Sequence, residues 1–158
     1  MSLFTWNLLL ALLWALITAD FTLYNLFIGA LLGFVVLFIA KPLFGKGKYF
    51  TRLPLAVAFA LYFIKELVVS SLRVAFEVIT PGYGMRPGVI AVPLSAKTDA
   101  EITILANLIT LTPGTLSLDV SSDKKVLYIH AMYVMPDAEA VRREIKEGLE
   151  RRILEVLR

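Results

Sequence analysis

The residues with the clearest chemical potential are Lys65 and Glu66, two adjacent side chains of opposite charge inside an apolar segment, residues 55–79. Ionisable groups are costly in a membrane, and those that occur there often belong to proton or ion routes. Adjacent opposite charges also mark helix edges that face water or a protein partner, and we favour this second interpretation. A proton relay through Lys65 and Glu66 is the alternative.

A polar stripe runs along the same segment when it is read as a helix. Its members are spaced four, three and four residues apart and so share one face; they are Glu66, Ser70, Arg73 and Glu77. We place on the opposite face Phe59, Phe63, Val74 and Val78. Two structures fit this pattern: an amphipathic helix in the cytoplasmic interface of a membrane, or a third span whose stripe faces a partner. The continuous stripe with both signs of charge favours the interfacial helix.

The rest of the chain offers no constellation that supports an enzyme. There is no cysteine and a single histidine, His130, so thiol chemistry and a histidine-rich metal site are excluded. Ser117 lacks the G-x-S-x-G context of a nucleophile, and the Pro113-Gly114 turn lacks the lysine of a phosphate loop. Asp119 and Asp123 fit an exposed strand position and turn chemistry. We therefore expect no catalytic residue, no cofactor and no metal.

The first part of the chain predicts a membrane hairpin. Between Met1 and Ala40 the only charged side chain is Asp20. A span needs about 20 apolar residues, so this stretch has room for two, and a carboxylate costs least at a turn in the aqueous interface. We expect a transmembrane helical hairpin over residues 1–41 with its turn at Asp20. Composition agrees, because 58% of the residues are hydrophobic and only 18% are charged.

Each helix of this hairpin carries a stripe of small and polar residues. The members are Asn7, Ala11 and Ala15 in the first helix and Asn25, Gly29 and Gly33 in the second. Small residues let helices approach closely in lipid, and polar side chains can bond between helices. The stripes fit two arrangements: packing on each other within the hairpin, or docking on another subunit.

Basic residues follow the hairpin, and they are Lys41, Lys46, Lys48 and Arg52. Positive residues near span ends mark the cytoplasmic side. We therefore expect the N-terminus and this segment in the cytoplasm, in a multi-pass protein of the cell membrane. Glycine and proline favour a linker over residues 42–54. The formal net charge of +3 arises before residue 80, because residues 80–158 hold equal numbers of acidic and basic side chains, so no basic face predicts nucleic-acid binding.

Residues 80–158 predict a small cytoplasmic α+β domain. Thr98 and Glu101 form a capping box in front of an apolar helix over Asp99–Leu111. The expected order is a strand at 89–94, that helix, strands at 116–120 and 126–134, and a last helix from Pro136 with Val141, Ile145, Leu149 and Ile153 at four-residue steps. This βαββα order is that of a ferredoxin-like half. The fold class is thus a membrane hairpin plus an amphipathic helix, followed by this domain.

One run in the domain resembles a known protein family. It covers residues 106–120, ANLITLTPGTLSLDV, and includes the turn Thr112, Pro113, Gly114 and Thr115. This run is similar to the signature of the E-type subunit of the Mrp-type multisubunit cation/proton antiporters. The segments at 65–71, 86–91 and 127–132 match the same family, so the resemblance extends over nearly the whole chain.

The resemblance implies an accessory and assembly subunit of a complex that exchanges sodium for protons, with the transport cores in the large A-type and D-type subunits. Its partners would be the other subunits, of A, B, C, D, F and G type, together with membrane lipid. Two spans and a cytoplasmic α/β domain are implied, which supports the interfacial interpretation of residues 55–79. Related subunits occur in membrane-bound hydrogenases, an alternative setting, and a solitary membrane-tethered sensor is a further alternative. No residue is carried over as an ion ligand.

Overall fold

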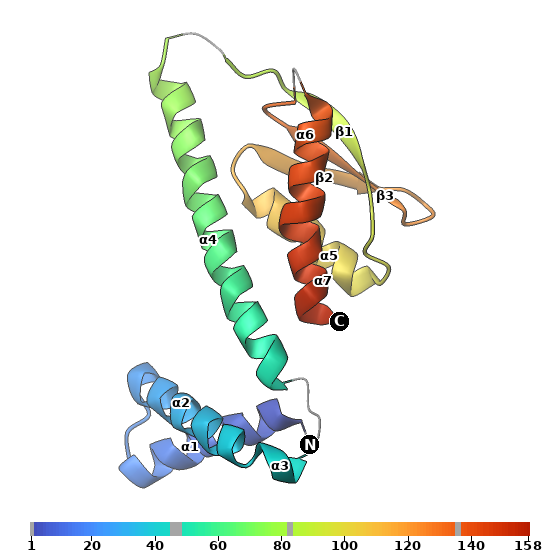
Figure 1. The fold of residues 1–158 in the computed structure, drawn as a ribbon. Coiled ribbons are helices and arrows are strands. Elements are labelled where there is room, and N and C mark those ends of the chain that lie inside the picture. Colours follow the sequence, from blue (N-terminus) through green and yellow to red (C-terminus); the bar gives the residue numbers. More distant parts are fainter. Residues whose placement is uncertain (1, 45–48, 82–83, 135–136) are drawn as a thin grey trace. The chain divides into compact units, whose positions relative to one another are not determined.

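The structure is a computed structural model of the chain, and it describes residues 2–44, 49–81, 84–134 and 137–158 (Figure 1). The chain divides into two compact units, Met1–Leu53 and Pro54–Arg158. Three residues used in the sequence interpretation lie outside the described residues: Lys46 and Lys48 of the basic cluster, and Pro136 at the expected start of the last helix.

The first unit is built around a helical hairpin of α1 (Leu3–Thr18) and α2 (Leu23–Ile39). Ala19 ends α1 in the left-handed conformation, with φ 52°. The Asp20 carboxylate then accepts hydrogen bonds from the amide of Thr22 at 2.9 Å and from its hydroxyl at 3.2 Å. The turn expected around Asp20 is therefore present, and its carboxylate organises the start of α2.

The hairpin helices are apolar but short. α1 has 16 residues and α2 has 17, so at about 1.5 Å per residue each is about 25 Å long, against about 30 Å of hydrocarbon in a bilayer. Among the described residues, one helix is long and apolar enough to cross a membrane by length and composition alone, and it is Tyr49–Ile79.

The expected linker over residues 42–54 is largely helical where it is described, which corrects the sequence interpretation. Its helices are α3 (Lys41–Phe44) and the first residues of α4 (Tyr49–Ile79). Aromatic packing accounts for the early start of α4, because the ring centre of Phe50 lies 5.4 Å from that of Phe34 in α2. Pro54 lies inside α4 and costs the helix one backbone hydrogen bond. Residue type alone suggested a break, and packing decided otherwise.

The second unit contains a three-stranded sheet of β1 (Gly88–Pro93), β2 (Thr115–Val120) and β3 (Val126–Ala131). The strand order is β1-β3-β2, and both pairs are antiparallel. β1 and β2 therefore run parallel on either side of β3, and the helix α5 (Asp99–Leu111) connects them. The capping box at the start of α5 is present as expected. The element order also follows the sequence prediction.

The last helix consists of three consecutive pieces, which together we call the C-terminal helix: α6 (Ala138–Arg143), η1 (Glu144–Glu150) and α7 (Arg151–Leu157). The π-helical piece η1 was not predicted. The buried residues Ile145, Leu149 and Ile153 explain it. Steps of four residues overshoot the α-helical turn of about 3.6 residues, and the wider π-helical turn keeps the three side chains on one face.

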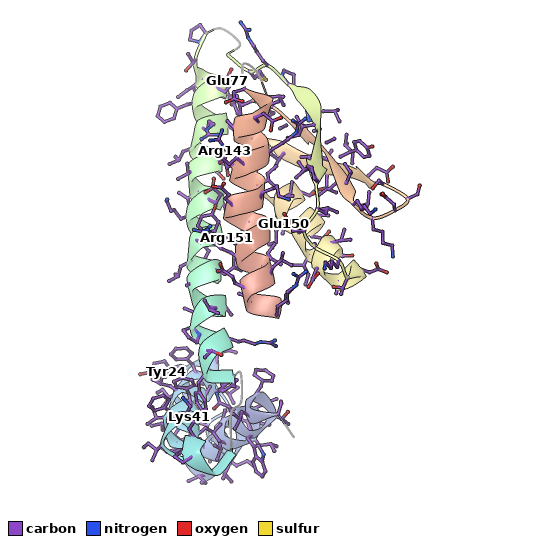
Figure 2. The ribbon with its side chains drawn as sticks, turned by 45° about the vertical axis from the view of Figure 1, so that its right-hand side comes forward. Tyr24, Lys41, Glu77, Arg143, Glu150 and Arg151 are labelled. Carbon is purple, nitrogen blue, oxygen red and sulfur yellow. The ribbon has the colours of Figure 1, made fainter. Side chains whose placement is uncertain are left out.

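The sheet and helices of the second unit form layers. One face of the sheet packs against α5 and the C-terminal helix around a core that includes Val92, Leu105, Leu127 and Ile129. α4 lies along the C-terminal helix on the side away from the sheet, as both views show (Figures 1 and 2). α4 thus covers the helical layer and leaves the other face of the sheet open.

The face of α4 that packs inward differs from the sequence interpretation. Phe59 and Phe63 pack against the core of the domain, on the same side as the buried Ser70. They were placed opposite the polar stripe, and that placement was wrong. Seven residues make almost two full helical turns, so Phe59 shares a face with Glu66, and Phe63 shares one with Ser70.

Candidate functional site

Two sets of residues that the sequence singled out meet in the second unit. A cavity of about 90 Å³ lies between α4 and the rest of the unit. Its walls combine members of the polar stripe with the complete turn motif: Glu66, Ser70 and Arg73 on one side, and Thr112, Pro113, Gly114 and Thr115 on the other. Other lining residues include Tyr62, Tyr133 and Glu144. This cavity is the candidate site.

The polar stripe of α4 faces the chain's own domain. Ser70 is buried, and its hydroxyl donates a hydrogen bond to the carbonyl of Glu66 at 2.7 Å. Glu77 lies beyond the cavity near the end of α4 (Figure 2). Its carboxylate accepts hydrogen bonds from the backbone amides of Gly84 at 2.6 Å and Met85 at 3.0 Å. The stripe is therefore a contact edge, and it ties α4 to the start of the domain.

Lys65 and Glu66 have different surroundings. Glu66 is half-buried and lines the cavity, whereas Lys65 is exposed and is not part of the cavity wall. Adjacent residues of an α-helix point about 100° apart, and the ion pairs of the described residues do not join these two. The relay hypothesis therefore gains no support from a pairing of Lys65 with Glu66.

The turn motif uses its hydroxyl groups to close α5. The Thr112 hydroxyl donates to the carbonyl of Leu108 at 3.0 Å, and the Thr115 hydroxyl donates to that of Ile109 at 2.6 Å. These carbonyls belong to the last turn of the helix, where few backbone amides remain as partners, and that of Ile109 also accepts from the Thr112 amide at 3.1 Å. Gly114 has φ 93°, a conformation that glycine adopts without strain. The motif is thus a helix stop built from side chains.

Cation–π contacts hold α4 to the domain at two places. The guanidinium carbon of Arg73 lies 5.8 Å from the ring centre of Tyr133. That of Arg152 in the C-terminal helix lies 4.0 Å from the ring centre of Tyr62. Such contacts each contribute about 0.5–2 kcal/mol. The Tyr133 hydroxyl is buried and has no hydrogen-bond partner among the described residues, which is the kind of group that buried water satisfies.

The cavity suits water better than an organic ligand. One water occupies about 30 Å³ in the liquid, so a few molecules fill about 90 Å³, whereas ligand sites measure about 300–1,000 Å³. The hydroxyls of Ser70, Thr112 and Thr115 already donate to backbone carbonyls. Within the described ranges no three His, Cys, Asp or Glu side chains gather as a metal site. The arrangement fastens α4 and can hold ordered water.

In the first unit, the two predicted stripes face each other, and we call their contact the hairpin seam. Its buried members are Asn7, Ala11 and Ala15 from α1, with Asn25, Gly29 and Gly33 from α2. The Asn25 amide group bonds across the seam: its nitrogen donates to the Thr18 hydroxyl and the Asp20 carbonyl, both at 2.6 Å, and its oxygen accepts from the Trp14 indole at 3.0 Å. Of the two arrangements left open, the contacts match packing within the hairpin.

The glycines of the seam allow the two backbones to approach closely. A Cβ atom on Gly29 would lie 2.9 Å from the carbonyl oxygen of Ala11. One on Gly33 would meet the side-chain oxygen of Asn7. The Asn7 amide nitrogen donates to the Tyr49 hydroxyl at 2.6 Å, and its buried oxygen has no partner among the described residues. A larger residue at Gly29 would therefore meet the backbone of α1, and one at Gly33 would have to displace the Asn7 side chain.

One structural anchor was missed by the sequence interpretation. Glu150 is buried in the C-terminal helix (Figure 2). Its carboxylate accepts hydrogen bonds from the backbone amides of Ser95 and Ala96, the latter at 2.9 Å, and lies 3.4 Å from the ammonium group of Lys146. No periodicity distinguishes Glu150 from the exposed glutamates around it, because its amide partners lie far away in the sequence.

A second anchor holds the end of the chain to α5. The Arg158 guanidinium donates to the Glu101 carboxylate at 3.0 and 3.1 Å. This hydrogen bonding lowers the pKa of Glu101 to about 2, with further contributions from the amides of Lys97 and Thr98. The capping glutamate predicted from the sequence is thus also an ion-pair partner, which local spacing could not indicate.

Comparison with known proteins gives full-length similarities. A family model described as Na+/H+ ion antiporter subunit matches residues 7–156. The E-type subunit of the Na(+)/H(+) antiporter of Alkalihalophilus pseudofirmus is 39% identical over 150 residues, which is 95% of this chain and 94% of that protein. The E-type subunit of the Na(+)/H(+) antiporter of Bacillus subtilis is 38% identical over 152 residues, 96% of each chain.

Two solved structures are also similar. A chain of the Mrp complex from Dietzia sp. DQ12-45-1b has a TM-score of 0.51 and 31% identity, and the match covers 66% of this chain and 98% of that one. A chain of the membrane-bound sulfane sulfur reductase, an archaeal respiratory membrane complex, has a TM-score of 0.59 and 26% identity and covers 96% of each chain.

Proposed function

We infer the function from the family to which this chain belongs, that of the E-type subunits of Na⁺/H⁺ antiporters. The observation that carries the inference is the family match over residues 7–156, together with 39% identity along nearly the whole of one relative. The chain is an accessory subunit of a multisubunit Mrp-type sodium/proton antiporter complex in a membrane. Its partners are the other antiporter subunits.

Assembly, rather than ion passage or catalysis, is the role that the site residues support. The Asn25 amide group of the hairpin seam is engaged within the hairpin, where it bonds to Trp14, Thr18 and Asp20. The polar stripe of α4 holds the domain, and the turn motif closes α5. A proton route through Lys65 and Glu66 is the alternative, and the exposure of Lys65 away from the cavity argues against it.

The proposed topology is supported by which face of α4 the domain covers. The outer face of α4, defined by residues that point away from the domain, is apolar and exposed: Leu61, Ile64, Val68, Leu72 and Ile79. The opposite face packs on the domain along its length, from the charged Arg152 beside Tyr62 to the backbone amide of Gly84, which binds Glu77. A charged domain packed along a helix is incompatible with that helix crossing hydrocarbon.

We therefore assign α4 to the cytoplasmic interface, with its outer face in the lipid surface. The domain then lies in the cytoplasm, α1 and α2 form the membrane hairpin, and the N-terminus is cytoplasmic, as the basic cluster around Lys41 predicts. The strand order β1-β3-β2 with α5 as crossover supports a ferredoxin-like half for the domain.

A second setting is favoured by one observation. The likeness to a chain of the archaeal sulfane sulfur reductase covers 96% of this chain with a TM-score of 0.59. Related complexes, including membrane-bound hydrogenases, therefore offer an alternative environment for the same accessory role.

The test is recovery of the tagged full chain from native membranes in mild detergent, with co-purifying proteins identified by mass spectrometry. Recovery with large antiporter-like subunits, and without reductase or hydrogenase subunits, is the expected result. Reductase or hydrogenase subunits would select the second setting. A solitary protein would contradict the assembly role. Glu66→Gln separates the relay alternative: an intact complex with lost transport would favour the relay, and an intact, active complex would exclude it.

A further inference from the structure

The face of the sheet that the helices leave open is apolar. Paired residues on antiparallel strands share a face, and the register pairs His130 with both Val89 and Leu116. Tyr128 lies two residues from His130 on β3, and Leu118 is the exposed extra residue of the β2 bulge between Ser117 and Asp119. The open sheet face is defined by these residues: Val89, Leu116, Leu118, Tyr128 and His130. The first four are exposed.

The open sheet face contrasts with the rest of the domain surface. Charged residues cover the C-terminal helix and the β2–β3 turn. On the strands of the open sheet face, the charged side chain is that of Asp119, which pairs with Tyr128 at the bulge of β2. The largest exposed apolar patch on a domain, typically about 300–600 Å², is often an interaction site.

A partner cannot bind the sheet by adding a strand to either of its edges. At the edge of β1 the Arg142 side chain donates to the carbonyl of Ala91 at 2.9 Å, and Lys146 donates to that of Pro93 at 2.6 Å. At the edge of β2 the amide of Ser117 donates to the Thr110 hydroxyl at 3.2 Å. Side chains therefore block both edges, a common protection against edge pairing, and a partner has to use the face.

Lipid is excluded as the occupant by the layer order of the second unit. The C-terminal helix lies between α4 and the sheet (Figures 1 and 2), so the outer face of α4 and the open sheet face are on opposite sides. If the outer face of α4 rests on the membrane, as the proposed function has it, the open sheet face points into the cytoplasm. Its occupant is then a protein.

The area of the open sheet face indicates which kind of protein can bind it. Three strands at about 4.8 Å spacing and six residues of about 3.3 Å each give about 300 Å². A stable interface between free proteins buries about 800 Å² on each partner, so this face alone does not hold a second copy of the chain. A neighbour already held beside it in the same membrane complex needs much less area, because tethering raises its effective concentration.

We propose that the open sheet face docks a mainly apolar surface on the cytoplasmic side of another subunit of the antiporter complex, with Asp119 left at the rim of the contact. This proposal rests on the proposed function for the identity of the complex and for the side of the membrane. Docking would bury Tyr128 and the two leucines of β2, and the β1 and β2 edges would remain capped as they are.

The experiment uses the full chain in native membranes. A photo-reactive phenylalanine analogue replaces Tyr128, and a matched variant carries the same analogue at the exposed Leu157 of the C-terminal helix. In parallel, a Leu116→Lys, Leu118→Lys double variant is compared with Leu157→Lys for recovery of the complex. We expect Tyr128 to cross-link to another antiporter subunit. We also expect the double variant, inserted at the wild-type level, to recover about tenfold less of the other subunits, because the lysines are buried unpaired.

The outcomes distinguish failure of the proposed function from failure of the docking proposal. If the wild-type chain brings down no antiporter subunits, the proposed function fails. If it brings them down but Tyr128 cross-links to nothing, to lipid or to a second copy, the docking proposal is overturned and the proposed function stands. The docking proposal is equally overturned if the double variant recovers the complex as well as Leu157→Lys. The cross-link decides the outcome if the double variant fails to fold.

Discussion

At the residue scale, the hairpin seam shows how one missing methyl group sets a helix distance. Gly29 faces the backbone of Ala11, with the carbonyl oxygen 2.9 Å and the Cα 3.1 Å from an added Cβ. Gly33 faces the end of the Asn7 side chain, which can rotate. The backbone atoms of a helix cannot shift independently of one another. Substitution of Gly29 is therefore more restricted than substitution of Gly33, although the two glycines lie four residues apart on the same helix.

Gly29→Ala is therefore expected to destabilise the hairpin by about 1–3 kcal/mol, since overpacking forces the backbones apart. Gly33→Ala, the matched control, is expected to cost less. The measurement is thermal unfolding of the full chain in detergent followed by tryptophan fluorescence, because the two tryptophans, Trp6 and Trp14, both lie in α1. Equal melting temperatures for Gly29→Ala and the wild type would contradict the close-packed seam.

At the element scale, the most recognisable run of the sequence serves as a helix stop. Residues 106–120 include the end of α5, the turn and all of β2. The Thr115 hydroxyl bonds to the Ile109 and Thr112 carbonyls at 2.6 and 3.0 Å. The motif therefore fixes where α5 ends and where β2 begins, and it places the turn in the wall of the cavity beneath α4.

Thr115→Val tests this role, because valine keeps the shape and strand preference of threonine and removes the hydroxyl. We expect a loss of about 0.5–1.5 kcal/mol, the net contribution of the lost hydroxyl hydrogen bonds, because the Ile109 and Thr112 carbonyls still accept from the backbone amides of Thr112 and Thr115. Thr110→Val is the matched control, and it removes a bond on an exposed hydroxyl, so its cost should be smaller. Chemical unfolding of the full chain in micelles, followed by circular dichroism, compares the two. A larger loss for Thr110→Val would refute the helix-stop role.

The sequence predicted a structural element correctly where that element depends on residues close to one another in the chain. The capping box at Thr98, the alternation in β2 and the turn at Asp20 depend on neighbours within a few residues. The early start of α4 at Tyr49 and the π-helical η1 depend on contacts between distant segments, whereas the face of Phe59 follows from its seven-residue spacing to Glu66. The cavity could not be predicted, because the polar stripe and the turn motif are brought together only by the packing of α4 on the domain.

At the scale of the whole molecule, the second unit has two apolar surfaces on opposite sides. The outer face of α4 is a strip about 28 Å long by helix geometry, and it suits a lipid surface because it is continuous and carries Lys65 at its border. The open sheet face suits a protein. The proposed topology and the proposed docking would together place this small domain between a membrane and a neighbouring subunit.

This orientation gives the last prediction. The chain has no cysteine, so single cysteines at Asp20, Leu72 and Ser122 report position through a membrane-impermeant maleimide. In inverted vesicles, whose cytoplasmic side faces outward, Ser122→Cys in the β2–β3 turn should react. Asp20→Cys should react only in right-side-out vesicles. Leu72→Cys on the outer face of α4 should react in neither until detergent removes the lipid. If α4 crosses the membrane, Ser122→Cys will instead react in right-side-out vesicles. If the outer face of α4 is in water, Leu72→Cys will react together with Ser122→Cys, and the interfacial assignment fails.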